Sequence, residues 1–167
     1  MASTSFASKS AVFFRPNTAK TVRANKPVVA RKALKVVSHC QVPCGIFDDS
    51  RQIAKLKEDV ATIRKAQTEM GDIGDASTVD SQNTFARWVI YKEKHADDII
   101  NEIGYYFMCQ RFPKFEFAST EDYNAALAAH HAVMVAAMKA KQGTATSTCD
   151  ALDSAIDAVS ALPMYNQ

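Results

Sequence analysis

The chain has 167 residues and a formal net charge of +2, and it is long enough for one domain with its own core. The charge is uneven: residues 1–38 hold 8 Lys/Arg and no acid, whereas residues 39–167 hold 12 Lys/Arg and all 18 acids and carry −6. This acidic balance argues against nucleic-acid binding, and no apolar run in the sequence is long enough to span a membrane.

The first 38 residues have the composition of an organelle transit peptide, because they are basic, free of acids and rich in Ser and Thr. The opening Met1–Thr4 and the short apolar run at 28–30 favour a plastid, with the stroma as the expected compartment, over a mitochondrion. A basic, disordered tail is the alternative. We therefore predict a disordered transit peptide or pro-segment at 1–38 and a mature domain at 39–167.

The next segment, which we call the hook (His39–Phe47), places one imidazole and two thiols within six residues. Cys40 and Cys44 are four residues apart, and a proline and a glycine beside Cys44 favour a chain that folds back rather than continuing as a helix. A cut just before His39 would add a free α-amine, whose unperturbed pKa is about 7.7–8.0.

The donors of the hook make it a candidate metal site. The amine, the amide nitrogen of Cys40 and the thiolates could close chelate rings in one plane, with the His39 imidazole in an axial position. Planar nitrogen and sulfur donors suit Ni(II) or Cu(II), whereas tetrahedral thiolate sites suit zinc. By spacing alone, two unrelated cysteines explain the pattern equally well, and the residue order does not fit haem attachment.

The other two cysteines, Cys109 and Cys149, lie in apolar helical contexts. We expect both to be small buried side chains. A disulfide framework is not expected of four cysteines in an intracellular compartment.

The sequence beyond the hook predicts helices. The first begins at Asp48–Ser50, which supply a cap and the negative charge favoured at a helix start. A loop is predicted at 71–83, where two glycines stand among short polar residues, and a second helix then continues to a region ended by Pro113. Apolar residues recur in both helices at three- and four-residue spacing: Ile53, Leu56, Val60, Ile63, Met70, Phe85, Trp88, Val89, Ile99, Ile103 and Phe107.

Two more helices complete the prediction. The third is capped by Ser119 and ends near Gly143, and the fourth starts at Ser147 or Thr148 and is stopped by Pro163. Their apolar faces comprise Tyr123, Leu127, His130, Val133, Met134, Ala137, Met138, Leu152, Ile156, Val159 and Leu162. No alternating β pattern competes. The expected fold is all-α, an antiparallel four-helix bundle with an N-terminal metal-binding hook.

The hook closely resembles the mature N-terminus of nickel superoxide dismutases, which is His-Cys-x-x-Pro-Cys-Gly-x-Tyr-Asp. The matching residues here are His39-Cys40-x-x-Pro43-Cys44-Gly45-x-Phe47-Asp48. A weaker likeness continues through Arg87–Glu93, Tyr105–Phe107 and Pro113–Phe115. In outline, the resemblance spans residues 39–167.

The resemblance implies an enzyme that disproportionates superoxide to O2 and hydrogen peroxide at a Ni(II)/Ni(III) centre, with one nickel ion per subunit. It implies that His39 ligates through its α-amine and imidazole, Cys40 through its amide nitrogen and thiolate, and Cys44 through its thiolate. These three residues are therefore the expected metal ligands and catalytic residues. The resemblance also implies a homohexamer of small bundles and a processing protease that exposes His39.

Departures from the family pattern concern the surroundings of the metal. Phe47 stands where the family has a tyrosine, so a hydroxyl is missing from the substrate-access region, and Gln41 stands where the family often has Asp. Tyr106 is the candidate for the family's second access tyrosine.

A carboxylate is also expected to orient the imidazole of His39. Glu58 and Asp59 are the candidates, and the alignment leaves both open because the first helix is about one turn longer than the family's. The basic residue that supports this carboxylate aligns best with His95, for which a bundle-facing histidine bonded to a neighbour is the alternative.

Two other classes of function fit the sequence. One is a non-catalytic helical bundle whose hook binds or senses a metal, which the Phe47 substitution keeps open. The other is a structural or partner-binding bundle in which the cysteines are incidental. Nickel content together with superoxide-dependent turnover separates an enzyme from both.

Overall fold

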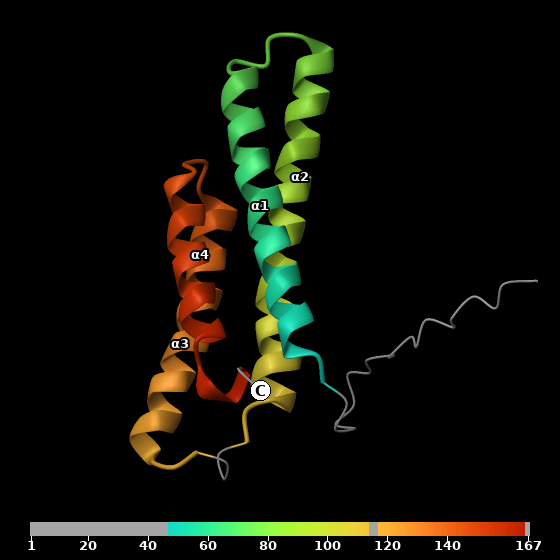
Figure 1. The fold of residues 1–167 in the computed structure, drawn as a ribbon. Helices are drawn as coiled ribbons and strands as arrows, with labels where there is room; N and C mark the ends of the chain where they lie inside the picture. Colours follow the sequence, from blue (N-terminus) through green and yellow to red (C-terminus); the bar gives the residue numbers. More distant parts are fainter. Residues whose placement is uncertain (1–46, 114–116, 166–167) are drawn as a thin grey trace, which may run out of the picture. The chain divides into compact units, whose positions relative to one another are not determined.

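A computed structural model of the chain describes residues 47–113 and 117–165, and these residues form helices and no strand (Figure 1). The four long helices are α1 (Asp49–Ile73), α2 (Val79–Glu102), α3 (Thr120–Gln142) and α4 (Ser147–Ser160). Two short elements complete them, the π-helix η1 (Ile103–Met108) and the 3-10 helix η3 (Pro163–Tyr165). The predicted transit peptide and most of the hook lie outside the described residues.

The starts of α1 and α3 follow directly from the sequence. The Asp48 side chain accepts a hydrogen bond from the Arg51 amide, and the Ser119 side chain accepts one from the Asp122 amide. Each cap satisfies one of the amide groups that a helix N-terminus leaves without a partner. Both predicted caps are confirmed.

The predicted loop at 71–83 is too long. Helix α1 continues to Ile73, and Gly74 follows with φ 60°, a left-handed conformation that favours glycine. Helix α2 already begins at Val79, because Thr78 and Ser81 form a reciprocal capping box. The sequence prediction took the start of this helix from the apolar pattern that begins at Phe85, and it assigned the polar residues before Phe85 to the loop. The predicted start is therefore too late.

The helices pack as a four-helix bundle in which each helix contacts its neighbours in the chain and α1 also contacts α4. Short links over 74–78 and 143–146 make α1 antiparallel to α2 and α3 antiparallel to α4, as Figure 1 shows. The predicted fold class is therefore confirmed. None of the helices in the described ranges is long and apolar enough to cross a membrane.

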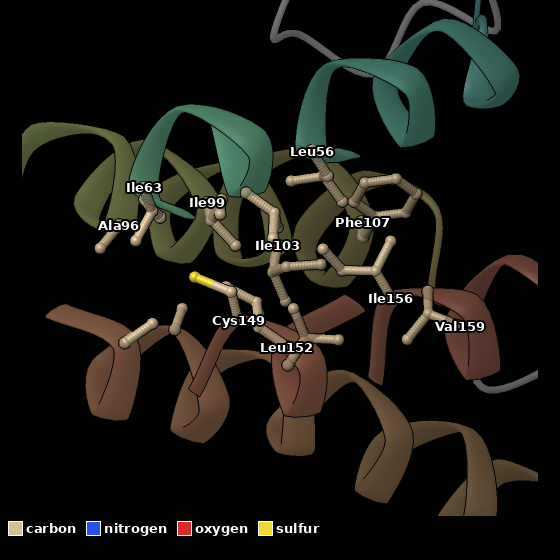
Figure 2. Packing of buried hydrophobic residues seen from close by; sticks show 14 of the residues in the cluster. Leu56, Ile63, Ala96, Ile99, Ile103, Phe107, Cys149, Leu152, Ile156 and Val159 are labelled. Atoms are coloured by element: carbon tan, nitrogen blue, oxygen red, sulfur yellow. The ribbon is translucent and has the colours of Figure 1, made fainter. Parts of the chain in front are cut away.

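Aliphatic side chains from α1, α2 and α4 meet in the core around Ile103 and Phe107 of η1 (Figure 2). The buried members that Figure 2 labels are Leu56, Ile63, Ala96, Ile99, Ile103, Phe107, Cys149, Leu152, Ile156 and Val159. Most of the predicted apolar positions are buried, although Met138 is exposed. The hydrophobic periodicity thus identified the core faces of the bundle.

One of the two cysteine predictions is wrong. Cys149 is buried in the core, and its thiol lies 3.3 Å from Gln67 Oε1. Cys109 is exposed, immediately after η1. The wider π-helical turn shifts the residues that follow it relative to a 3.6-residue pattern, so the face predicted for Cys109 does not apply.

Candidate functional site

The three predicted nickel ligands, His39, Cys40 and Cys44, lie outside the described residues. Phe47, the last residue of the hook, is described and leads through Asp48 into the first turn of α1. Two groups of polar side chains occur on α1 and its neighbours, one around Asp59 and one around Asp49. Each includes residues that the sequence singled out.

Asp59 and His95 are in direct contact across the α1–α2 interface. Asp59 Oδ1 lies 2.7 Å from His95 Nδ1, and Asp59 Oδ2 accepts a hydrogen bond from Lys55 at 2.9 Å. Asp59 is only 5% exposed, and these two contacts give its carboxylate oxygens partners in a site shielded from water. Glu58, the other candidate carboxylate, is exposed.

Further titratable groups surround this pair. A carboxylate oxygen of Asp98 lies within 4.8 Å of the ligand atoms of Asp59 and His95. Burial, followed by the charges of Asp59 and Asp98, raises the pKa of Glu102 above its ordinary value, whereas Lys55 acts in the opposite direction. This part of the α1–α2 surface is therefore densely charged, with cations and carboxylates interleaved.

The second group, which we call the Asp49 clamp, consists of Asp49, Tyr106 and Arg111. Tyr106 is 4% exposed and donates a hydrogen bond from its hydroxyl to Asp49 Oδ1 at 2.9 Å. The same hydroxyl accepts a bond from the Asp48 amide at 3.0 Å. Burial and the bond to Asp49 raise the pKa of Tyr106 well above its ordinary value, so the phenol stays protonated.

Arg111 completes the clamp by a bidentate ion pair. Its Nε lies 2.9 Å from Asp49 Oδ1, and its Nη2 lies 2.7 Å from Asp49 Oδ2. Both side chains are mostly shielded, with exposed fractions of 18% for Arg111 and 13% for Asp49. A planar guanidinium and a carboxylate in this arrangement form one of the stronger and most directional pairs in proteins.

Phe47 packs against the clamp. Its ring meets the Tyr106 ring edge to face at a centroid distance of 6.0 Å, and the Arg111 guanidinium lies 4.6 Å from its centroid. An aromatic face attracts a cation at this distance. The structure thus brings together two residues, Phe47 and Tyr106, that the sequence had flagged separately.

Sequence reasoning missed Arg111 altogether and recognised Asp49 only as a charge at a helix start. The two residues are 62 positions apart, and no local pattern marks such a pair. The one available signal in the sequence was Asp49 itself. It follows the cap residue Asp48 and so is not needed to cap the helix.

One buried histidine belongs to the packing of the C-terminal turn. His130 Nδ1 lies 2.7 Å from the Ala126 carbonyl oxygen, and its Nε2 lies 2.8 Å from the Tyr165 hydroxyl. This geometry fits a neutral ring that donates from Nδ1 and accepts at Nε2. Burial lowers the pKa of His130, which favours the same neutral state.

Comparison with known proteins assigns the chain to a family. The model of the family described as nickel-containing superoxide dismutase matches residues 34–166, which include the hook and all four helices. No match to the chain was found among curated proteins or among solved structures. Because the match covers most of its length, the chain belongs to the nickel-containing superoxide dismutase family.

Proposed function

We propose that the chain disproportionates superoxide at a nickel ion held by the hook, with His39, Cys40 and Cys44 as the ligands. Family membership makes the protein a nickel-dependent superoxide dismutase, an oxidoreductase that converts superoxide to O2 and hydrogen peroxide. The single observation that carries the proposal is the family match over residues 34–166, which contains the whole donor set.

The donor set of the hook fits nickel. Two thiolates, an imidazole and, after cleavage, an α-amine are available within six residues, and soft sulfur with nitrogen donors suits this metal. Bound nickel supplies the one-electron redox chemistry by alternating between Ni(II) and Ni(III). The chain must then keep the two cysteine side chains as thiolates, hold the ligands in place and limit the access of other molecules to the metal.

We assign the support of the His39 imidazole to the pair of Asp59 and His95. A carboxylate has more acceptor sites than its present bonds to His95 and Lys55 occupy, so Asp59 can also accept an imidazole N–H. Groups of this kind fix the orientation of a ligating histidine and raise its basicity. The exposure of Glu58 leaves Asp59 as the better candidate.

Phe47 and Tyr106 are proposed to limit access to the metal. Their rings pack against each other, and neither offers a free hydroxyl: Phe47 has none, and that of Tyr106 bonds to Asp48 and Asp49. Tyr106 is therefore a poor proton source, and water is the expected donor of the two protons that peroxide formation consumes.

Processing before His39 and a plastid location are proposed from the uneven charge of the sequence. A plastid protease system would remove the basic segment 1–38, and a cut before His39 would release the amine that the ligand set requires. The measurement is the intact mass and N-terminal sequence of the native protein. Active protein with a different N-terminus would contradict this part of the proposal.

Assembly into a homohexamer is proposed from the family resemblance. Large apolar side chains on α2 and its continuation support an interface, because Val79 is 81% exposed, Ile90 is 64% exposed and Tyr105 is 61% exposed. Sedimentation of the processed protein tests it. A fully active monomer would contradict it.

The function is tested by nickel content and superoxide turnover measured on the same processed protein. Cys44→Ser should lose both, because a hydroxyl is a poor substitute for a thiolate donor. Cys109→Ser is the matched control, since Cys109 is an exposed cysteine outside the hook, and it should retain both. Bound nickel without turnover in the wild type would instead indicate a metal-binding bundle that lacks catalysis.

A further inference from the structure

The Asp49 clamp joins the start of α1 to two residues that lie 57 and 62 positions further along the chain. Asp49 lies in the first turn of α1, Tyr106 lies on η1, and Arg111 follows η1. Arg111 Nη2 also lies 3.4 Å from the carbonyl oxygen of Met164 in the C-terminal turn. The start of α1 is therefore tied to two other segments through one guanidinium.

This arrangement is not needed to begin helix α1. The cap of α1 is formed by Asp48, whose side chain accepts hydrogen bonds from the Arg51 amide and the Ser50 hydroxyl. The remaining favourable contribution of an acid in the first turn requires only its charge, not a bidentate partner. A shielded, doubly bonded arginine on Asp49 therefore points to a requirement other than helix initiation.

One member of the clamp, Asp49, lies close in sequence to the predicted ligand Cys44. Cys44 precedes Phe47 by three residues, and three residues of extended chain span at most about 11 Å. An anchor on residues 47–49 consequently limits how far the Cys44 thiolate can move. Phe47 itself contacts both the Tyr106 ring and the Arg111 guanidinium.

We propose that Arg111 is a positioning residue for the hook, acting through Asp49 and Tyr106 to fix residues 47–49 and thereby the thiolate of Cys44. This inference rests on the proposed function, because it assumes that the hook holds the nickel ion. Arg111 performs this role without touching the metal or superoxide. The phenylalanine at position 47 then serves as a surface for the guanidinium rather than as a hydrogen-bond donor.

Arg64 provides a matched control for a general effect on stability. It is also an arginine that ties α1 to another helix, through ion pairs of 2.7 Å with Asp150 and Asp153 of α4. It lies 15 residues further along α1 than Asp49, roughly 22 Å away at 1.5 Å per residue. Arg64→Met thus removes an arginine–carboxylate interaction between α1 and another helix, more exposed than the clamp and far from the hook.

The experiment compares processed, nickel-loaded wild type with Arg111→Met, Asp49→Asn, the double variant and Arg64→Met. The rate of nickel release to a chelator and the nickel EPR spectrum are measured. Arg111→Met should release nickel at least about tenfold faster than the wild type and should change the EPR spectrum. A tenfold effect corresponds to the lower end of the range for losing a hydrogen bond to a charged group. Asp49→Asn should act in the same direction, and the double variant should resemble Arg111→Met, because both changes remove one interaction.

Two outcomes would overturn the inference. One is equal nickel release from Arg111→Met and Arg64→Met, which would indicate a general loss of stability. The other is additive effects of Asp49→Asn and Arg111→Met, which would show that the residues act independently. If Arg111→Met does not fold, Arg111→Lys replaces it, since lysine keeps the charge but cannot form the bidentate pair.

Hydrogen exchange of the Asp48 amide tests the clamp independently of the proposed function. This amide donates to the Tyr106 hydroxyl, so its exchange in the full-length, metal-free chain reports the clamp directly. Exchange should accelerate in Arg111→Met and stay unchanged in Arg64→Met. A wild-type hook that binds no nickel would contradict the proposed function, whereas an Asp48 amide that does not respond to Arg111→Met would contradict the positioning role.

Discussion

Tyr106 donates a hydrogen bond to Asp49 at 2.9 Å while its hydroxyl accepts one from the Asp48 amide at 3.0 Å. A buried side chain on η1 thus contacts the two residues at which the hook passes into α1. Through the chain, a change at Tyr106 can reach the proposed metal ligands without direct contact. Changes at Tyr106 therefore test how the conformation at the start of α1 affects the protein.

Tyr106→Phe should lower the free energy of unfolding by about 1–2 kcal/mol, because two hydrogen bonds in a shielded site are lost. The raised pKa of the phenol adds a pH signature. Its contribution to stability is present in full below about pH 10, where the unfolded tyrosine ionises, and is lost as the pH rises further. Denaturant unfolding of both proteins from pH 8 upward measures it, and a pH-independent difference would be inconsistent with it.

Protonation of His130 should destabilise the fold in acid. Burial lowers the pKa of this histidine in the folded state, so the unfolded chain binds more protons below about pH 6.5. The stabilising contribution is present above that pH and is lost as the pH falls through the folded value. His130→Gln should weaken this pH dependence, whereas His131→Gln, at the exposed neighbour, should preserve it. Equal pH dependence in the two variants would contradict the assignment.

Asp59→Asn should reduce superoxide turnover by roughly 10–100-fold, the usual effect of removing a group that orients a metal ligand. The amide loses the charge that pairs with Lys55 and His95. Glu58→Gln is the control, because this neighbour is exposed. Turnover and circular dichroism should be recorded together, and a folded Asp59→Asn with wild-type turnover would remove Asp59 from the site.

Phe47→Tyr should retain nickel and change turnover by less than about tenfold, or roughly 1.4 kcal/mol in barrier. The added hydroxyl lies on a ring already held by Arg111 and Tyr106, and the redox chemistry depends on the metal ligands. Pulse radiolysis of both nickel-loaded proteins provides the comparison. An inactive wild type that the tyrosine rescues would show that catalysis requires the hydroxyl.

The sequence predicted those parts of the fold that depend on local interactions. The caps at Asp48 and Ser119 and the apolar faces of the helices could be recognised because each involves residues a few positions apart. The start of α2 was missed because its cap precedes any apolar repeat. The π-helix was missed because the periodicity argument assumes the same number of residues in every helical turn. Cys109, which follows the π-helix, was therefore wrongly predicted to be buried.

For the candidate site, too, individual residues could be predicted from the sequence, whereas contacts between distant residues could not. The resemblance of the hook singled out Asp59, His95 and Tyr106 individually, but the contact between Asp59 and His95 depends on how α1 packs against α2. The choice between Glu58 and Asp59 is likewise a matter of which face of α1 is buried. Arg111 had no sequence signal, because its partner is brought to it only by the completed fold.

The π-helical turn also restricts which changes in chain length the protein can tolerate. The Cys109 amide bonds to the Gly104 carbonyl, five residues back, so η1 accommodates a residue that an α-helix would not. Deleting a residue within η1, such as Gly104, would restore the α-helical repeat and leave the flanking parts in nearly the same orientation. Deleting a residue from the regular part of α2 after His95 would instead rotate the flanking parts by about 100° relative to each other. His95 and Tyr106 would then face different directions, and the two polar groups would separate even if every functional side chain is kept.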